Sequence, residues 1–438
     1  MNRTATSLLA LFLALPLASA QTPDPHGIAV DSIDTSVRPG DDFYLFANGA
    51  WIKRTELAPD RATWGTFNIL ADRSNERTAA IIEETNKSNP APGTDNRRIA
   101  DLYASYMDEA AIEARGLAPI KPHLDAIAAI KTRRELSRAL GGTIRADVDA
   151  LNNTNFHTPN IFGLWVAPGF NDPAHYAPYL LQGGLQLPNR DYYLSMSPRM
   201  VDIRDRYRAH IEAMLRLAGF SEPEARAVRI VALERAIAEK HISLADSEDI
   251  HKANNVWRAA DFSTKAPGID WAEFFRAANL GKQASFIVWQ PTAFTGESAL
   301  VASEPLDAWK DLLAFHVLEA YGGALPKNIA DERFAFTGKV LSGVTEQRPR
   351  PIRAVMLVNG VLGDAVGQVY AKKYFSPEAK AQAEALVANL IATFHQRLEA
   401  ITWMAPPTKA EALAKLGTLR VSVGYPDHFR SYNGLEIK

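Results

Sequence analysis

The sequence has no cysteine among its 438 residues. Disulfide bonds, thiolate metal ligands and a cysteine nucleophile are therefore excluded. The chain is long enough to bury a large core without covalent cross-links. Its stability must come from that burial or from bound ligands.

No excess of charge of either sign is present. The 48 lysine and arginine residues nearly balance the 50 aspartate and glutamate residues, which leaves a formal charge of -2. Because a protein that binds nucleic acid usually has a strongly basic face, this balance gives no support for a nucleic-acid partner. The hydrophobic content of 47% and the charged content of 22% are typical of a globular protein.

Long hydrophobic runs are also scarce. The run Leu8–Leu17 is too short to span a bilayer, which needs about 20 residues. It follows Arg3 and precedes the small residues Ala18-Ser19-Ala20, a pattern typical of a secretory signal peptide over residues 1–20. No later stretch stands out as a transmembrane segment. We therefore expect a secreted or periplasmic protein with no membrane span after cleavage of the signal.

Helical periodicity predominates after residue 40. Apolar residues recur at steps of three and four between Ser376 and Met404, which predicts a long amphipathic helix with Ser376 as its N-cap. Thr408 and Glu411 have the spacing of a capping box and predict the start of the next helix. Similar patterns predict helices over residues 99–114, 200–218, 222–240, 304–321, 334–344 and 351–374.

Two extended segments interrupt the helical pattern. The segments IFGLWVAPG and YAPYLLQGG, at residues 161–169 and 176–184, predict a short β-hairpin. Residues 21–40 lack periodicity and predict an extended lead-in. The expected fold is mainly α, with one helical domain over residues 41–438.

The sequence contains no self-contained catalytic motif. A helical zinc-protease site needs two histidines one turn apart with a glutamate between them. No pair among the ten histidines has this spacing, and the nearest two, His241 and His251, are ten residues apart. Acidic residues around this pair leave a loop metal site conceivable, but a polar helix end and turn explains the stretch as well.

Other candidate groups have structural explanations. His210 and His316 lie on apolar stripes and are expected to be packed, hydrogen-bonded histidines. Asp41-Asp42 opens a helical pattern and is expected to cap it. The glycines of GVLGDAVG, at residues 360–367, lack the spacing of a dinucleotide-binding loop and predict close helix packing.

A family resemblance extends over nearly the whole chain after the signal peptide. PGDDFYLFANGAW, at residues 39–51, resembles the opening of the mature domain in the neprilysin and endothelin-converting-enzyme family of zinc metallopeptidases. Further similar segments follow in the family's order: WGTFNIL, LYASYMDEAAIEARG, GLQLPNRDYYL, SGVTEQRPRPIRAVMLVNGVLGDAVGQVYAKKYF and VGYPDHFRSYNGLEI. The chain thus resembles the N-terminal half of such a peptidase.

The resemblance implies a role for the chain and shows which family motifs its sequence lacks. In complete members this helical half caps a zinc-bearing half and encloses a chamber that admits oligopeptides. The His-Glu-x-x-His helix and the helix with the third zinc ligand follow the segment that resembles VGYPDHFRSYNGLEI, and neither motif occurs in this sequence. We therefore expect a truncated or split enzyme: a chamber domain with no catalytic or metal-binding residue of its own, inactive in isolation, with zinc only in complete family members.

The resemblance also indicates residues that contact substrate. The loop around WGTFNIL faces the cleft in animal members, so Trp64, Phe67 and Asn68 are the candidate substrate-binding residues. For Trp64 and Phe67, simple core packing is favoured over substrate contact. Ala71 and Thr63 stand at or near positions where animal members carry arginines, which puts recognition of the distal peptide carboxylate in doubt. A non-catalytic protein that binds peptides, or that pairs with a separate catalytic half, is the alternative function.

Overall fold

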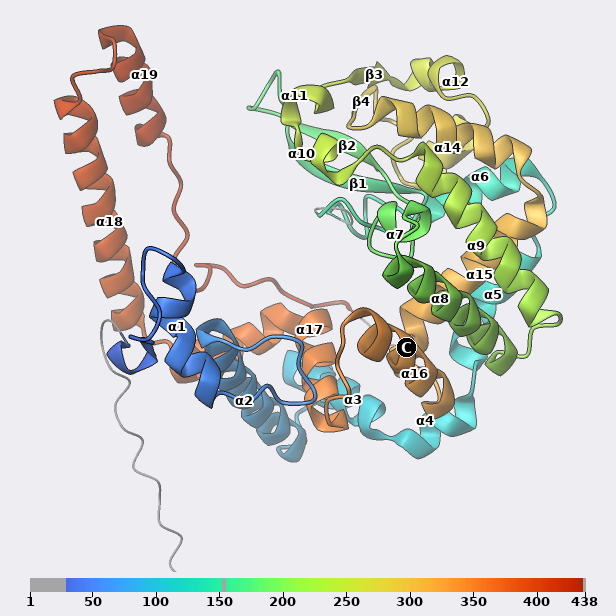
Figure 1. Ribbon diagram of the computed structural model, residues 1–438, viewed down its shortest axis with the longest axis horizontal. Coiled ribbons are helices and arrows are strands. Elements are labelled where there is room, and N and C mark those ends of the chain that lie inside the picture. Colours follow the sequence, from blue (N-terminus) through green and yellow to red (C-terminus); the bar gives the residue numbers. More distant parts are fainter. Residues whose placement is uncertain (1–28, 152–154, 436–438) are drawn as a thin grey trace, which may run out of the picture. The chain divides into compact units, whose positions relative to one another are not determined.

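The computed structural model describes residues 29–151 and 155–435 (Figure 1). The expected signal peptide and the first part of the lead-in therefore lie outside the described residues. The chain divides into two compact units, Met1–Ala58 and Pro59–Lys438.

The first unit consists of the 3-10 helix η1 (Val30–Ser32) and helix α1 (Phe43–Arg54). The side chain of Asp42 accepts a hydrogen bond from the backbone N–H of Leu45, so the expected N-cap is confirmed. Asp34 connects the segment before α1 to the end of that helix, because Lys53 Nζ lies 2.7 Å from its Oδ2. The hydrogen bond from Lys53 is the main cause that lowers the pKa of Asp34 to about 2.

The second unit is built mostly from helices. Its first helices are α2 (Thr66–Lys87), α3 (Asp95–Met107), α4 (Glu109–Arg115), α5 (Lys121–Ala128), α6 (Arg133–Gly142), α7 (Asp191–Leu194), α8 (Pro198–Leu217), α9 (Pro223–Lys240), α10 (Leu244–Glu248) and α11 (Ile250–Ala253). They are followed by α12 (Phe262–Lys265), α13 (Trp271–Ala277), α14 (Pro291–Ser303), α15 (Leu306–Tyr321), α16 (Lys327–Phe334), α17 (Arg350–Tyr374), α18 (Pro377–Ala400) and α19 (Pro406–Gly417). The predicted mainly α fold is confirmed.

Two predicted helices differ from the structure. The prediction of a single helix over residues 99–114 is wrong. Two helices cover this range, because α3 ends before Asp108 and α4 begins after it. The Asp108 side chain accepts a hydrogen bond from the N–H of Ala111 and so caps a new helix. The pattern expected at residues 334–344 is the π-helix η5 (Ala335–Leu341), which follows α16 directly.

The predicted β-hairpin is confirmed but belongs to a larger sheet. Strands β1 (Phe162–Pro168) and β2 (Tyr176–Gln182) pair in antiparallel fashion, with Phe162 opposite Gln182. β4 (Ser285–Val288) pairs parallel to β2, and β3 (Val256–Arg258) pairs antiparallel to β4. The strand order is β1-β2-β4-β3.

The main core lies around this sheet and the helices between α5 and η5. Phe162 of β1 stacks on Phe294 of α14 with 4.0 Å between ring centroids, and Trp271 of α13 lies 5.7 Å from Phe162. Each buried aromatic side chain removes roughly 150–250 Å² from water, which is worth about 4–6 kcal/mol of gross hydrophobic free energy. A smaller second cluster joins α2, α3 and α17.

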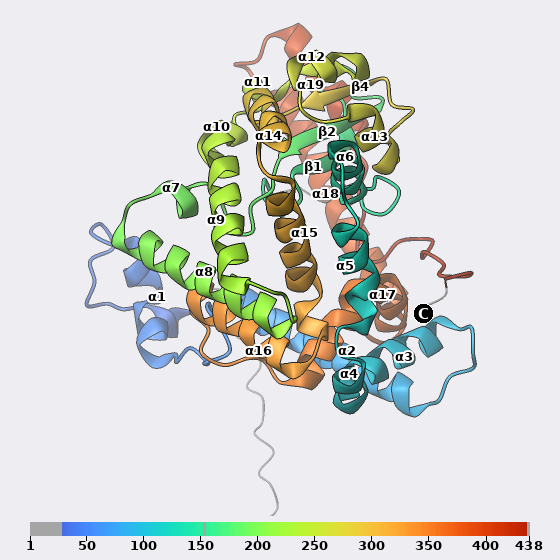
Figure 2. The ribbon, with the colours of Figure 1, turned by 90° about the vertical axis from the view of Figure 1, so that its right-hand side faces the viewer.

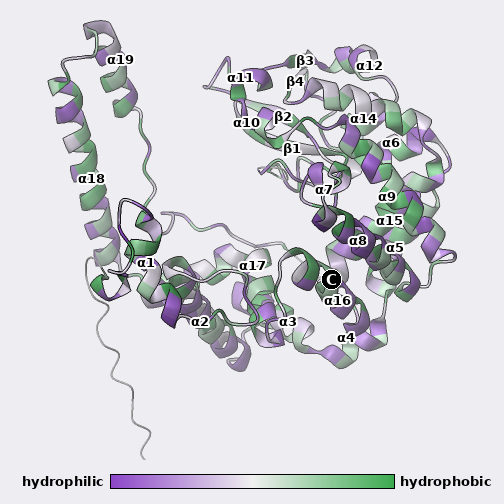
Figure 3. Cartoon of the chain, viewed as in Figure 1, coloured by the Kyte–Doolittle hydropathy of each residue, from purple (hydrophilic) through white to green (hydrophobic). Residues whose placement is uncertain are grey.

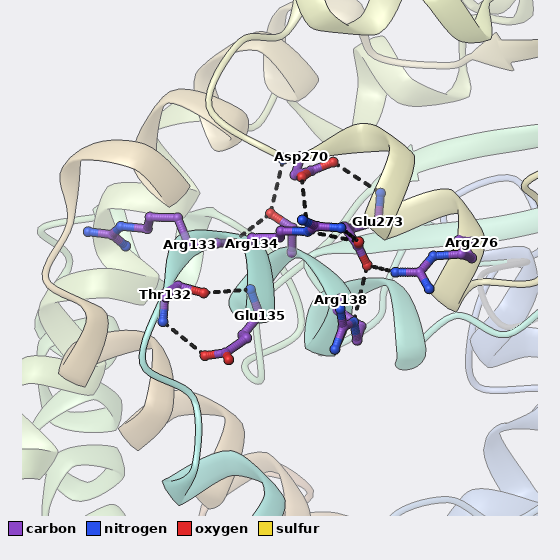
Figure 4. A network of polar contacts seen from close by, with 9 residues as sticks. Thr132, Arg133, Arg134, Glu135, Arg138, Asp270, Glu273 and Arg276 are labelled. Atoms are coloured by element: carbon purple, nitrogen blue, oxygen red, sulfur yellow. Dashed lines mark hydrogen bonds and ion pairs between the residues drawn. The ribbon is translucent and has the colours of Figure 1, made fainter.

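A buried carboxylate connects α6 to α13 (Figure 4). Glu273 of α13 is nearly inaccessible to solvent and accepts hydrogen bonds from Arg134, at 2.8 Å from Nε, and from Arg138, at 3.1 Å. Arg276 also pairs with it. The helices approach closely at Gly141, where an added Cβ would lie 2.2 Å from the carbonyl oxygen of Phe274. Only glycine permits this contact.

Helix α17 differs from two expectations. By length and composition alone it could cross a membrane, although no such stretch was expected after the signal peptide. Its buried residues pack in the cluster with α2 and α3, and a core helix of a soluble protein meets the same criteria. The prediction that a neighbouring helix packs closely at Gly360, Gly363 and Gly367 is wrong. A Cβ atom added to any of these glycines would have no atom within 4 Å.

Helices α18 and α19 pack against each other, but none of their residues is buried. Ser376 caps α18 as expected, since its side chain accepts a hydrogen bond from the N–H of Ala379. The capping box expected for α19 is wrong: the helix already begins at Pro406, a residue that favours the first helical turn. Hydrophobic residues recur along α18 (Figure 3), and Leu386, Leu390 and Phe394 are 62%, 54% and 63% exposed.

Candidate functional site

The candidate substrate-contact residues lie at the start of α2. Trp64 precedes the helix, and its ring lies under the guanidinium of Arg61, with 4.5 Å between the Arg61 Cζ and the ring centroid. Arg61 is itself held by Asp72, whose Oδ2 lies 2.6 Å from Nη1, and this bond raises the pKa of Arg61. A fixed cation therefore positions the Trp64 ring, which belongs to none of the three hydrophobic core clusters of the described residues.

The other two predicted residues differ in exposure. Phe67, in the first turn of α2, is 88% exposed, so core packing does not describe its role in the second unit. Asn68, the next residue, is half-buried. Its Oδ1 would lie 3.9 Å from a Cβ atom added to Gly65. An exposed aromatic ring beside a carboxamide offers apolar contact and hydrogen bonds to a peptide.

The structure adds neighbours that the sequence did not indicate. The backbone oxygen of Pro59 accepts hydrogen bonds from the N–H groups of Thr345 and Glu346, at 3.0 and 3.1 Å. A cavity of about 160 Å³ lies between the start of α2 and α17, and its lining includes Arg61 and Met356. Arg61 thus contacts Trp64 and lines the cavity. These neighbours lie almost 300 residues apart in the chain, so no local pattern could have indicated them.

The positions near which animal relatives carry arginines hold no charge here. Thr63 and Ala71 are both exposed, at the two sides of the Trp64–Asn68 segment. The cation closest to this segment in sequence, Arg61, is already paired with Asp60 and Asp72. The site is therefore suited to apolar side chains more than to a free carboxylate.

No group of three or more histidine, cysteine, aspartate or glutamate side chains in the described residues could hold a metal ion. His241 is buried: its Nε2 donates to the carbonyl oxygen of Gly183 at 2.8 Å and lies 3.1 Å from Glu297 Oε1. Burial lowers the pKa of His241 to about 4. His251 lies exposed on α11, so the two histidines do not form the loop metal site considered above. These donors do not fit a catalytic zinc, which takes three protein ligands and a water molecule.

His210 is a packed, hydrogen-bonded histidine, as expected. Its Nε2 lies 2.8 Å from Glu319 Oε1, its Nδ1 lies 3.0 Å from Glu332 Oε1, and its ring stacks on Phe336 at 4.8 Å. His316 lies on α15, and no hydrogen-bond partner of its buried Nε2 is found in the described part of the chain.

The model of peptidase family M13 matches residues 39–426, and the chain belongs to this family. The predicted resemblance is thereby confirmed.

Individual relatives agree with this assignment. Mus musculus endothelin-converting enzyme-like 1 is 26% identical in an alignment of 407 residues, and the match covers 90% of this chain and 52% of the relative. Homo sapiens neprilysin is 24% identical in an alignment of 427 residues, and the match covers 91% of this chain and 55% of neprilysin. The chain therefore spans about half the length of these relatives.

A solved structure supports the fold. The zinc metalloprotease Zmp1 of Mycobacterium tuberculosis, in complex with an inhibitor, is 32% identical and superimposes with a TM-score of 0.83. The match covers 94% of this chain and 61% of Zmp1.

Proposed function

We propose that this chain is the N-terminal substrate-chamber domain of a secreted neprilysin-like zinc metalloendopeptidase that acts on oligopeptides. Its family membership and its similarity to relatives about twice as long support this role. A catalytic zinc activates water and polarises the peptide carbonyl in such enzymes. The donors found in the described residues do not fit that ion. The proposed role of the chain is to shape the site and to bind the peptide.

The uncovered apolar face of α18 carries the proposal. Leu386, Leu390 and Phe394 recur on one side of the helix at steps of four and are more than half exposed. Burying such a side chain fully is worth roughly 1.5–3 kcal/mol, and contiguous exposed apolar surface usually marks an interaction site. A zinc-bearing half, either in the same polypeptide or as a separate chain, is the partner that we propose for this face.

Within the chamber, Trp64, Phe67 and Asn68 are proposed to contact the peptide. The aromatic rings would receive apolar side chains, and the Asn68 carboxamide would bond to the peptide backbone. Export is part of the same proposal: cleavage after Ala20 would place the protein outside the cytoplasm.

Metal analysis and a peptidase assay test the function. The purified chain should contain no stoichiometric zinc and should not cleave a fluorogenic peptide with large apolar residues. Turnover that a chelator abolishes would contradict the proposal. N-terminal sequencing of exported protein should begin at Gln21.

A non-catalytic peptide-binding or peptidase-partner protein is the second candidate. The exposed Phe67 favours it, since a peptide could bind there without a metal. A stable monomer that binds peptides with micromolar affinity and does not cleave them would support this candidate. Aggregation of the isolated chain through α18 would favour the chamber domain.

A further inference from the structure

A second, larger cavity lies beside α17, at Gly363 and Gly367. Its volume is about 430 Å³, within the range of roughly 300–1,000 Å³ that small-molecule sites occupy. α17 packs beside α2 in the smaller core cluster (Figure 2), and Tyr432 holds the irregular segment after α19 against the same cluster. The whole lining belongs to the Pro59–Lys438 unit and shares no residue with the cavity at Arg61.

Aromatic side chains form much of the wall of this cavity: Tyr370, Tyr374, Phe375, Tyr425 and Phe429. The ring centroids of Tyr370 and Tyr374 are 5.1 Å apart. The Tyr425 ring lies 5.7 Å from that of Phe375 and 5.9 Å from that of Phe429, so the rings hold one another in place. Aromatic faces bind another ring by offset or edge-to-face contact. This wall therefore favours a ligand with a flat ring.

Glycines leave room for such a ring against the backbone of α17. Gly363 and Gly367 are about one turn apart and line the cavity. A Cβ atom added to either would have no atom within 4 Å, so a longer side chain at these positions would occupy the cavity. The glycines of GVLGDAVG thus widen a cavity and do not admit a neighbouring helix.

Arg77 of α2 supplies a positive charge to the lining. Its guanidinium lies over the Tyr374 ring, with 4.9 Å between Cζ and the centroid. Its Nη1 lies 3.5 Å from the Tyr370 hydroxyl oxygen, and this contact lowers the pKa of Tyr370. Arg77 is exposed, and no aspartate or glutamate in residues 29–151 or 155–435 forms an ion pair with it. Asp364, the acidic residue of the lining, is paired with Arg430 at 3.5 Å, so the charge left open to a ligand is positive.

We propose that this cavity binds a small molecule that carries a flat aromatic ring and a carboxylate. The ring lies between the aromatic wall and the glycine backbone of α17. The carboxylate pairs with Arg77, because a guanidinium stacked on a ring keeps its N–H groups at its edge, where a carboxylate accepts two hydrogen bonds. This site is independent of the proposed peptidase function, since it uses neither zinc nor the segment Trp64–Asn68.

2-Naphthoate is a suitable probe, and two analogues separate its ring from its charge. The purified chain should bind one 2-naphthoate saturably, as measured by isothermal titration calorimetry. 2-Naphthamide keeps the ring and loses the charge, so it should bind about tenfold more weakly. Cyclohexanecarboxylate keeps the charge and loses the flat ring, so it should bind about fivefold more weakly.

Leucine substitutions in α17 test the place of binding. G367L fills the cavity and should weaken the binding of 2-naphthoate at least about tenfold. G363L fills it from the preceding turn and serves where G367L does not fold, as judged by circular dichroism. G360L is the matched control and should bind as wild type, because Gly360 also has open space around an added Cβ but lies outside the lining.

R77Q tests the ion pair. It should weaken the binding of 2-naphthoate about tenfold and leave that of 2-naphthamide nearly unchanged. R208Q, at an exposed arginine of α8, is the control and should bind both probes as wild type.

Three results would overturn the proposal. The first is an absence of saturable 2-naphthoate binding, or binding that G367L and G363L leave unchanged. The second is an equal affinity of the wild-type chain for 2-naphthoate and 2-naphthamide, which would mean that Arg77 does not recognise the carboxylate. The third is tighter binding of the peptide Gly-Gly-Phe than of 2-naphthoate, which would make the occupant the C-terminal end of a peptide.

Discussion

His210 Nε2 lies 2.8 Å from Glu319 Oε1, and both side chains are almost completely buried. The other ring nitrogen bonds to Glu332, so two carboxylates hold one imidazole between α8, α15 and α16. Burial by itself would lower the pKa of His210. The hydrogen bonds and charges of Glu319 and Glu332 outweigh that effect and raise the pKa above its ordinary value of 6.5.

This arrangement predicts a loss of stability with rising pH. A group whose pKa is higher in the folded than in the unfolded state stabilises the fold fully below the unfolded pKa of about 6.5, and the stabilisation disappears as the pH passes the folded value. The contribution of His210 to the free energy of unfolding, measured by urea denaturation as wild type minus H210Q, should therefore fall as the pH rises above about 6.5. H210Q should remove this dependence, whereas H251Q, at an exposed histidine, should keep it. The buried His241, whose pKa is lowered to about 4, adds stability as the pH rises toward 6.5 and is the same in both proteins. A difference between wild type and H210Q that grows with pH would contradict the assignment.

Gly141 and Gly142 provide a matched pair at the end of α6. G141A places a methyl group 2.2 Å from the Phe274 carbonyl oxygen, so α6 and α13 must separate and the fold should lose about 1–3 kcal/mol. G142A meets no atom within 4 Å and should be neutral or stabilising by up to about 1 kcal/mol, because alanine favours a helix. Equal melting temperatures for the two variants would show that the close approach of the helices is not needed.

Much of the fold could be predicted because long helices carry a strong periodic pattern. α8, α9, α15 and α17 lie within two residues of their predicted bounds. Strands β3 and β4 were missed, since three- and four-residue strands show no measurable alternation. The break at Asp108 was missed because the apolar pattern continues across it, while a local cap decides where the backbone turns.

The candidate site was less accessible to sequence reasoning. Trp64, Phe67 and Asn68 could be named only from the family resemblance. Hydrophobic periodicity indicates which side chains are buried, so it cannot identify an exposed aromatic ring that binds a ligand. The contact of Arg61 with Trp64 and the cavity beside α17 depend on tertiary structure. Periodicity also predicted an apolar face on α18 but could not tell what covers it.

Substitution of Phe67 should affect peptide binding and leave the fold intact. The ring is 88% exposed, so F67A should change the free energy of unfolding by less than about 0.5 kcal/mol. Loss of its proposed contact should weaken the binding of an apolar peptide about fivefold to thirtyfold, corresponding to about 1–2 kcal/mol. Y176A removes an aromatic ring of similar exposure at the start of β2 and is the control. Isothermal titration calorimetry measures both, and an equal effect of the two substitutions would refute the assignment of Phe67.

The apolar face of α18 should determine how the chain associates. Replacement of Leu386, Leu390 and Phe394 by serine removes three exposed apolar side chains at once, and the loss of stability should stay small because none of them is buried. The variant should show less self-association in light scattering than the wild-type chain. It should also fail to bind a zinc-bearing half that the wild-type chain binds. A triple alanine-to-serine change at Ala379, Ala383 and Ala388 is the control, since it alters the same helix without removing large apolar groups. If both variants associate as the wild-type chain does, another surface must hold the partner, and the chamber role would lose the observation that carries it.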